Sequence, residues 1–254
     1  MSIMPAFDLL PPWEDREMLR RFMTEEGLQL LVPVRGSPEF NSALGLLGGA
    51  RPACSDPAYF LVCCSDSSGS VLAAMDCCTA GNTLLMLRSR VSKRVEKMQL
   101  HLLLYGAALA KARPESVFCT APRSSLSPEL AGKLIFLGRG LGMSAIPANH
   151  WILFIRRMGR ESDPITDGGE VAASLRSLRK FFDNGIDAVI SEVERKGMLP
   201  LVQLPNSPDR PEHLHELKEA VLALGLPVNG LESVLDTIRL IYVEDRHDIT
   251  PDAL

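Results

Sequence analysis

Three short apolar runs follow one another in the middle of the chain, and each ends at residues that favour a turn. The runs are Tyr59 to Cys64, Val71 to Cys78 and Thr83 to Leu87. The two intervening segments, Ser65 to Gly69 and Thr79 to Asn82, are short, polar and contain glycine. Short apolar runs joined by such segments are typical of antiparallel hairpins. The pattern therefore predicts a three-stranded antiparallel meander.

Helical and strand patterns alternate after the meander. We expect a charged loop from Arg88 to Lys97, and then a nearly all-apolar helix that ends near Lys111. A strand at 117–121 and a helix opened by Ser127 and Pro128, which suit the cap and the first helical position, come next. Two further strands are predicted at 143–146 and 151–155. The predicted order is β-β-β-α-β-α-β-β. An amphipathic helix that ends at Gly27 precedes it, and Leu28 to Val34 is either a strand or the end of a second helix.

The chain beyond Met158 has the character of a helical tail. Apolar stripes at helical spacing recur there, the first formed by Val171, Leu175, Leu178 and Phe182. Three more stripes follow at 186–193, 214–224 and 231–238. We expect a boundary between residues 163 and 169, and hence a domain at 1–160 and a C-terminal helical domain at 161–254. Stripes this apolar must be buried against something, which makes a homodimer one expectation.

Composition narrows the functional classes. The formal charge of -4 argues against a general nucleic-acid binder, which normally carries a basic face. The most apolar stretch, Leu100 to Ala110, is shorter than the roughly 18–20 residues of a membrane span. The first 16 residues lack the pattern of a secretory signal peptide. We therefore expect no membrane span and a cytoplasmic protein.

The six cysteines include two vicinal pairs, Cys63–Cys64 and Cys77–Cys78. Both pairs lie in predicted strands, where successive side chains point to opposite faces of the sheet and cannot converge on one ion. We expect reduced structural cysteines and no metal site.

The order of elements resembles that of the GCN5-related N-acetyltransferase (GNAT) superfamily, from about Ala6 to Arg157. This resemblance implies an α+β fold of α/β/α layers, with a twisted, mixed and mostly antiparallel sheet and flanking helices. It also implies that the strand, loop and helix from Leu84 to Ala110 hold an acyl-CoA, with the diphosphate near the start of the helix.

Basic residues agree with that implication. Arg88, Arg90, Lys93, Arg94 and Lys97 give five cations in ten residues, opposed by Glu96 alone. Such a cluster suits a polyphosphate, although it is also compatible with a solvated loop. The residues expected to bind acetyl-CoA or another acyl-CoA are Leu87, Arg88, Val91, Lys93, Arg94 and Lys97.

Several positions depart from the family pattern. No glycine occurs between Arg88 and Tyr105, whereas the family places glycines where the main chain meets the phosphates. Phe136 stands where a tyrosine often protonates the leaving thiolate, and phenylalanine has no proton to donate. The catalytic residues are therefore unknown. Asp76, as an acid, base or substrate ligand, and His101 are candidates, and both are also compatible with structural roles.

Two functions from different classes remain. The first is an N-acyltransferase that moves an acyl group from CoA to an amine on a small molecule or a protein. The second is an inactive GNAT-like protein that binds a ligand, or a scaffold whose helical tail binds a partner. An unrelated α+β domain is a third, weaker interpretation. A wedge-shaped gap between the strands at 83–88 and 117–121 separates the first two from the third.

Overall fold

The computed structural model describes residues 1–11, 15–92, 98–123, 126, 134–135, 137–159, 165–182, 185–202, 204 and 213–226. Its strands are β1 (Gln29–Leu31), β2 (Tyr59–Ser65), β3 (Val71–Ala80), β4 (Thr83–Val91), β5 (Ser116–Pro122), β6 (Ser144–Pro147) and β7 (Trp151–Arg157). Its helices are α1 (Arg16–Glu25), α2 (Pro38–Leu46), α3 (Met98–Ala112), α5 (Gly168–Leu178), α6 (Ile186–Lys196) and α7 (His213–Ala223). Short 3₁₀ helices are η1 (Phe7–Leu9), η2 (Pro52–Ser55) and η4 (Arg179–Phe181).

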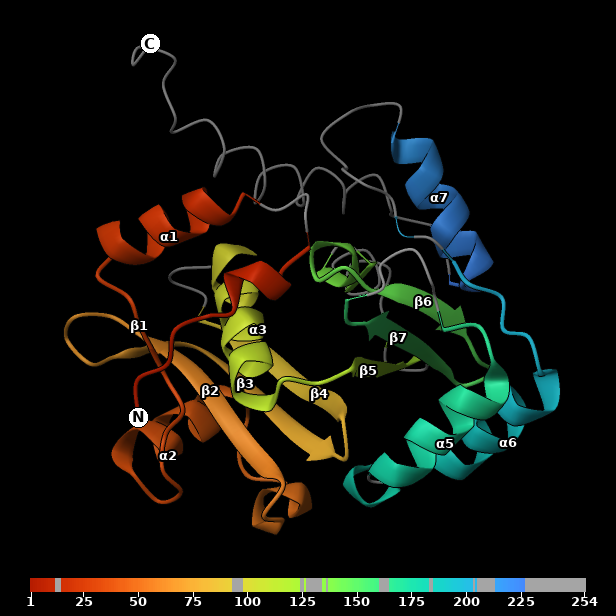
Figure 1. Cartoon of the computed structure of the whole chain (residues 1–254), viewed down its shortest axis with the longest axis horizontal. Helices are drawn as coiled ribbons and strands as arrows, with labels where there is room; N and C mark the ends of the chain where they lie inside the picture. Colours follow the sequence, from red (N-terminus) through yellow and green to blue (C-terminus); the bar gives the residue numbers. More distant parts are fainter. Residues whose placement is uncertain are drawn as a thin grey trace.

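All the strands belong to one sheet, flanked by helices (Figure 1). The strand order is β1-β2-β3-β4-β5-β7-β6. Each neighbouring pair is antiparallel except β4 and β5, which are parallel because α3 carries the chain back between them. The predicted α+β fold class, with a mixed and mostly antiparallel sheet, is confirmed.

Two hydrophobic clusters cover the two faces of the sheet. On the first face α3 packs across β2, β3 and β4, with α1 and the N-terminal segment beyond it (Figure 1). On the second face lie α2, α5 and α6. The vicinal cysteines obey this division, since Cys64 and Cys77 belong to the first cluster and Cys63 and Cys78 to the second. All six thiols are free, and the described residues contain no group of three or more side chains placed to hold a metal ion.

Helix α3 is apolar all round because it is covered on both sides. Its residues from Leu102 to Leu109 are all buried, and Gly106 among them has no side chain to hold a neighbouring segment away. The N-terminal segment lies against it there: the Gly106 carbonyl accepts a hydrogen bond from the Ala6 N–H at 2.9 Å, and a Cβ at position 106 would lie 2.9 Å from Pro5 Cβ. A helix buried between a sheet and a covering segment has no polar face to show. None of the described helices is both long and apolar enough to span a bilayer.

The structure adds a helix between α1 and β2 and differs from one expectation. Residues 38–46 form α2, whose N-terminus is capped by Ser37 and opened by Pro38. The charged segment expected to be a loop from Arg88 begins later, because β4 continues to Val91 in register with β3. Of the two choices for 28–34, the strand is right, as β1 shows.

The C-terminal tail contributes to both faces. Val171, Leu175 and Val189 of α5 and α6 belong to the second-face cluster, together with strand residues such as Phe118. Val221 of α7 and Leu224, which directly follows α7, belong to the first-face cluster. The division into domains at residue 160 stays a prediction, and the fourth stripe of the tail, at 231–238, lies outside the described residues.

Candidate functional site

Strands β4 and β5 are paired only over their first halves. The parallel ladder runs from Thr83 opposite Ser116 to Met86 opposite Cys119. Beyond that point β4 continues to Val91 against β3, and β5 continues to Pro122 against β7. The two strands therefore separate, and the gap opens at the middle of the sheet.

A β-bulge marks the point of separation. Cys77 lies opposite Met86 and Asp76 lies opposite Arg88, so Leu87 is one residue more than β3 can pair. A bulge bends its strand, leaves the extra residue out of the regular ladder and shifts the alternation that follows. The shift here sends Arg88 and Arg90 to the second face and Ser89 and Val91 to the first. In agreement, Val91 packs against the first-face cluster.

A cavity of about 340 Å³ occupies the gap. Its first-face wall is apolar and rich in sulfur, with Met75, Met86, Cys119, Met143 and Phe154. Residues 137–141, of which 137–140 are helical, close that wall through Leu137, Gly138 and Leu141. The polar lining comes from three segments: Arg88, Ser89 and Arg90 of β4, Thr120 of β5, and Arg51 of the loop after α2.

Gly138 is a place where the wall has no room for a side chain. A Cβ at this position would lie 2.9 Å from Phe154 Cδ1 and 3.0 Å from Leu204 Cδ1. Both contacts are closer than packed carbon atoms tolerate, so a larger residue would displace the aromatic ring that lines the cavity.

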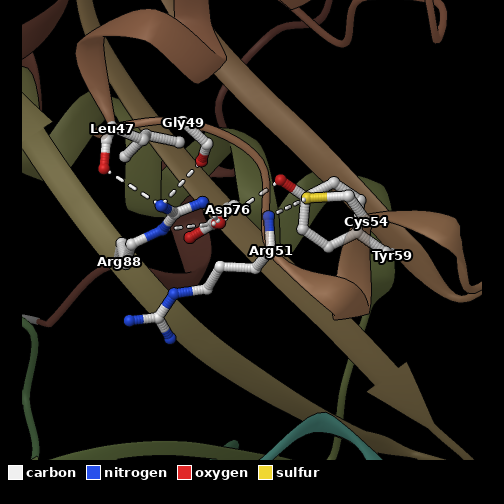
Figure 2. A network of polar contacts seen from close by, with 7 residues as sticks. All are labelled: Leu47, Gly49, Arg51, Cys54, Tyr59, Asp76 and Arg88. Carbon is white, nitrogen blue, oxygen red and sulfur yellow. Dashed lines mark hydrogen bonds and ion pairs between the residues drawn. The ribbon is translucent and has the colours of Figure 1, made fainter. Parts of the chain in front are cut away.

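A buried ion pair lies beside the cavity (Figure 2). Arg88 Nε and Nη2 donate to Asp76 Oδ2 at 2.9 and 2.6 Å, and Arg88 Nη1 donates to the carbonyls of Leu47 and Gly49 at 3.0 and 2.9 Å. The Tyr59 hydroxyl donates to the same carboxylate oxygen at 3.2 Å. The side chain of Asp76 is wholly buried and that of Arg88 is 14% exposed. Arg88 is thus fixed in one orientation from three sides.

Electrostatics in this network keep Arg88 charged. Burial by itself lowers the pKa of Arg88, but the hydrogen bonds and the attraction of Asp76 outweigh burial and raise that pKa above its ordinary value. Burial also raises the pKa of Tyr59 well above its ordinary value, so this phenol stays protonated. Asp76 Oδ1 is buried without a hydrogen-bond partner among the described residues. The structural alternative for Asp76 is thus favoured, with Arg88 as its partner.

A second polar pair lies on the first face. Ser89 Oγ lies 2.8 Å from His101 Nδ1 of α3, and Ser89 also lines the cavity. Burial lowers the pKa of His101 to about 4, so the imidazole is neutral at pH 7. With hydrogen on Nε2 the neutral ring accepts a hydrogen bond from the Ser89 hydroxyl, and with hydrogen on Nδ1 it donates one to Ser89 Oγ.

Three of the residues expected to bind acyl-CoA are described by the structure. Leu87 and Arg88 line the cavity, whereas Val91 is partly buried against the first-face cluster and is not among the residues that line the cavity. Lys93, Arg94 and Lys97, and also Phe136, lie outside the described residues. The roles of all these residues stay predictions.

Arg51, Arg90, Ser89 and Thr120 were not among the expected site residues, although Arg90 belongs to the basic cluster. No sequence pattern points to Arg51, which follows a glycine-rich segment and precedes the first strand of the meander. Ser89 next to two arginines reads as part of a solvated loop until the strand is seen to extend through it.

The strand order, the single parallel pair β4–β5 and the gap between these strands are the arrangement of the GNAT fold, and the chain has this fold. No family model and no curated protein matches the sequence. Solved structures that resemble it include a protein from Klebsiella pneumoniae described as an acyl-CoA N-acyltransferase, with 13% identity and a TM-score of 0.44 over 52% of this chain and 97% of that one.

Two further solved structures resemble the chain in the same part. A GNAT family acetyltransferase from Elizabethkingia anophelis with acetyl-CoA bound has 12% identity and a TM-score of 0.40, over 52% of this chain and 99% of the other. A spermidine N-acetyltransferase from Vibrio cholerae in complex with CoA and spermine has 9% identity and a TM-score of 0.38, over 54% and 99%. Each of these comparisons covers about half of this chain.

Proposed function

We propose that the protein is an N-acyltransferase that transfers an acyl group from acetyl-CoA or another acyl-CoA to an amine. The observation that carries this proposal is the open gap between β4 and β5, which holds a cavity that the side chains of the described residues line but do not fill. A narrow apolar slot through a sheet suits a linear thioester arm, which is apolar along its sides and carries amide groups that pair with strand edges.

The unpaired edges of the two strands supply those partners. Past Met86 and Cys119 the main-chain groups that would have joined β4 to β5 face the gap. Each such group needs a hydrogen-bond partner, because an unpaired main-chain group in a dry site is costly. Amides of a bound pantetheine arm would meet this need in the way that a third strand would.

The reaction requires stabilisation of the oxyanion that forms when the amine attacks the thioester carbonyl. The bulge at Leu87 takes main-chain groups of this residue out of the regular ladder beside the cavity. A main-chain N–H there would donate to the oxyanion, and the fixed gap would hold the two reactants in line. The C–N bond forms as the C–S bond breaks, the amine loses a proton and the CoA thiolate gains one.

Ser89 is our candidate for the donor to the thiolate. Its hydroxyl lines the cavity on the face of α3, from which the CoA would enter. With a hydrogen on Nδ1, neutral His101 would donate to Ser89 Oγ and leave the hydroxyl hydrogen of Ser89 for the thiolate. The Ser89–His101 pair would supply the proton for the thiolate that Phe136 cannot supply. The phosphates of CoA would be met by Lys93, Arg94 and Lys97, just before α3, in place of the usual glycine-rich main chain.

Titration calorimetry with acetyl-CoA and longer acyl-CoAs tests the proposal. The wild-type protein should bind in the micromolar range. Joint substitution of Arg94→Ala and Lys97→Ala should weaken binding by roughly tenfold or more, because each charge-assisted hydrogen bond contributes about 1.5–3 kcal/mol. A matched double variant, Arg21→Ala with Arg195→Ala, removes the same charge from exposed helix positions and should bind as the wild type does.

Turnover is then measured as release of free CoA thiol in the presence of primary amines. Binding without turnover for any amine would favour the inactive ligand-binding alternative, which the loss of the family's glycines and tyrosine suggests. No binding of any CoA species would overturn the transferase proposal and leave a scaffold.

A further inference from the structure

Basic side chains form part of the cavity lining. Arg51, Arg88 and Arg90 contribute to it, and no aspartate or glutamate is among the described residues of the lining. The Asp76 carboxylate beside the lining balances the charge of Arg88. The exposed Arg90 therefore supplies the charge that would repel a polyamine and attract an anion. The part of the cavity near Arg90 therefore favours an anionic molecule over a cationic one.

The side of the sheet follows from the register. Arg90 lies opposite Ala74 and Arg88 opposite Asp76, and residues directly opposite share one face. Ala74 belongs to the second-face cluster, whereas α3 packs on the first face. Arg88 and Arg90 are therefore on the other side of the sheet from the helix near which the proposed function places the CoA phosphates.

Arg88 is prepared for an anion by its own surroundings. Asp76, Leu47 and Gly49 take up Nε, Nη1 and one N–H of Nη2, so the planar group cannot turn (Figure 2). The second N–H of Nη2 has no partner among the described residues. Arg90 is exposed, and none of the ion pairs within the described part of the chain involves it. One guanidinium is thus rigid and its neighbour on the strand is adaptable.

We infer that the acyl acceptor is an amine that also carries a carboxylate, of the kind found in a free amino acid, and that Arg88 and Arg90 bind this carboxylate on the second face of the sheet. The inference rests on the proposed function. Guanidinium groups bind carboxylates through paired, charge-assisted hydrogen bonds, which fix orientation as well as charge. The amine of such an acceptor would then point into the gap, toward the thioester that enters from the first face.

The experiment compares acceptors that differ only in the carboxylate. L-Leucine and L-leucinamide form one pair, glycine and glycinamide another, and spermidine represents the polyamines. Acetyl-CoA is the donor, and the readouts are the KM of each acceptor, kcat, and the calorimetric Kd of acetyl-CoA. The acids should have kcat/KM values at least roughly tenfold above those of the amides, as loss of a charge-assisted contact implies.

Variants at Arg90 assign the preference to this residue. Arg90→Gln should remove most of the preference for acids by raising their KM, and should leave the Kd of acetyl-CoA within about twofold of wild type. Arg90→Lys should restore part of the preference, because it restores the charge without the paired geometry. Arg195→Gln, on the exposed part of α6, is the matched control and should change neither value.

A separate binding measurement distinguishes failure of this inference from failure of the transferase proposal. N-Acetyl-L-leucine should bind to the protein without CoA, its amide should bind at least roughly tenfold more weakly, and Arg90→Gln should abolish the difference. Carboxylate binding without acyl-CoA binding would overturn the transferase and retain the anion site. A preference for amides or spermidine, or a weaker Kd for acetyl-CoA in Arg90→Gln, would overturn the inference, and in the latter case the arginines would hold a CoA phosphate.

Discussion

Replacement of Asp76 by asparagine tests the buried network most directly. The substitution keeps the size of the side chain and removes its charge, while Arg88 remains 14% exposed and charged. Loss of one partner from a buried ion pair costs about 3–5 kcal/mol. Two carbonyls, those of Leu47 and Gly49, still accept from Nη1, and the asparagine oxygen accepts one bond. We therefore expect a loss at or just below the lower limit of that range, about 2–3 kcal/mol in the free energy of unfolding.

Urea denaturation followed by circular dichroism measures this loss, with Asp187→Asn as the control. Asp187 pairs with Arg179 at 2.8 Å, but both side chains are more than 60% exposed. Such a surface pair contributes at most about 1 kcal/mol. The control should therefore change stability little, although it removes the same charge from a contact of similar length.

A double-mutant cycle with Arg88→Gln separates the pair from its surroundings. The two single variants should each be destabilised, and the double variant should be destabilised by less than their sum, with a coupling of about 1–3 kcal/mol. Additive effects, or an Asp76→Asn protein within about 0.5 kcal/mol of wild type, would refute the argument that Asp76 holds Arg88 in place.

Three further predictions concern other parts of the molecule. Burial lowers the pKa of His101 from 6.5 to about 4, so as the pH falls the unfolded chain takes up a proton before the folded chain does. The free energy of unfolding should therefore fall by on the order of 3 kcal/mol between pH 6.5 and pH 4, relative to the His101→Gln variant. Parallel pH profiles of unfolding for the two proteins would contradict this prediction. Ser89→Ala should lower kcat with a chosen amine by at least roughly tenfold and leave the Kd of acetyl-CoA unchanged, whereas an unaltered kcat would remove Ser89 from the reaction. Gly168→Ala places a Cβ 2.1 Å from the Val193 carbonyl oxygen and should cost about 1–3 kcal/mol or more, while Gly45→Ala, with open space around it, should be neutral or mildly stabilising in thermal melts.

Much of the fold could be predicted because its signals are local. Short polar segments with glycine predict the turns after β2 and β3, and Gly69 and Gly81 adopt positive φ angles of 83° and 55° in these turns. The alternation of side chains along β2 and β3 distributes the paired cysteines to both faces without reference to the rest of the chain. The apolar character of α3 likewise shows that it is covered.

The candidate site was predicted only in part, because it depends on contacts distant in sequence. Arg51 reaches the cavity from the loop after α2, and Arg88 is held by carbonyls some 40 residues earlier in the chain, with Leu47 and Gly49 separated from it by 41 and 39 positions. Such proximity is decided by how α2 packs on the sheet. No local sequence pattern predicts this proximity.

The sequence by itself determined the order of strands and helices, the pairing of hairpins and the supply of positive charge at the end of β4. Only the tertiary structure decided which way that charge points. Regular pairing would set Arg88 opposite Met75, on the side of α3, but the extra residue at Leu87 turns Arg88 to Asp76 and the other side. The physical reason is the period of two in a strand: one inserted residue exchanges the faces of every side chain that follows, and pairing with β3 decides where it is inserted.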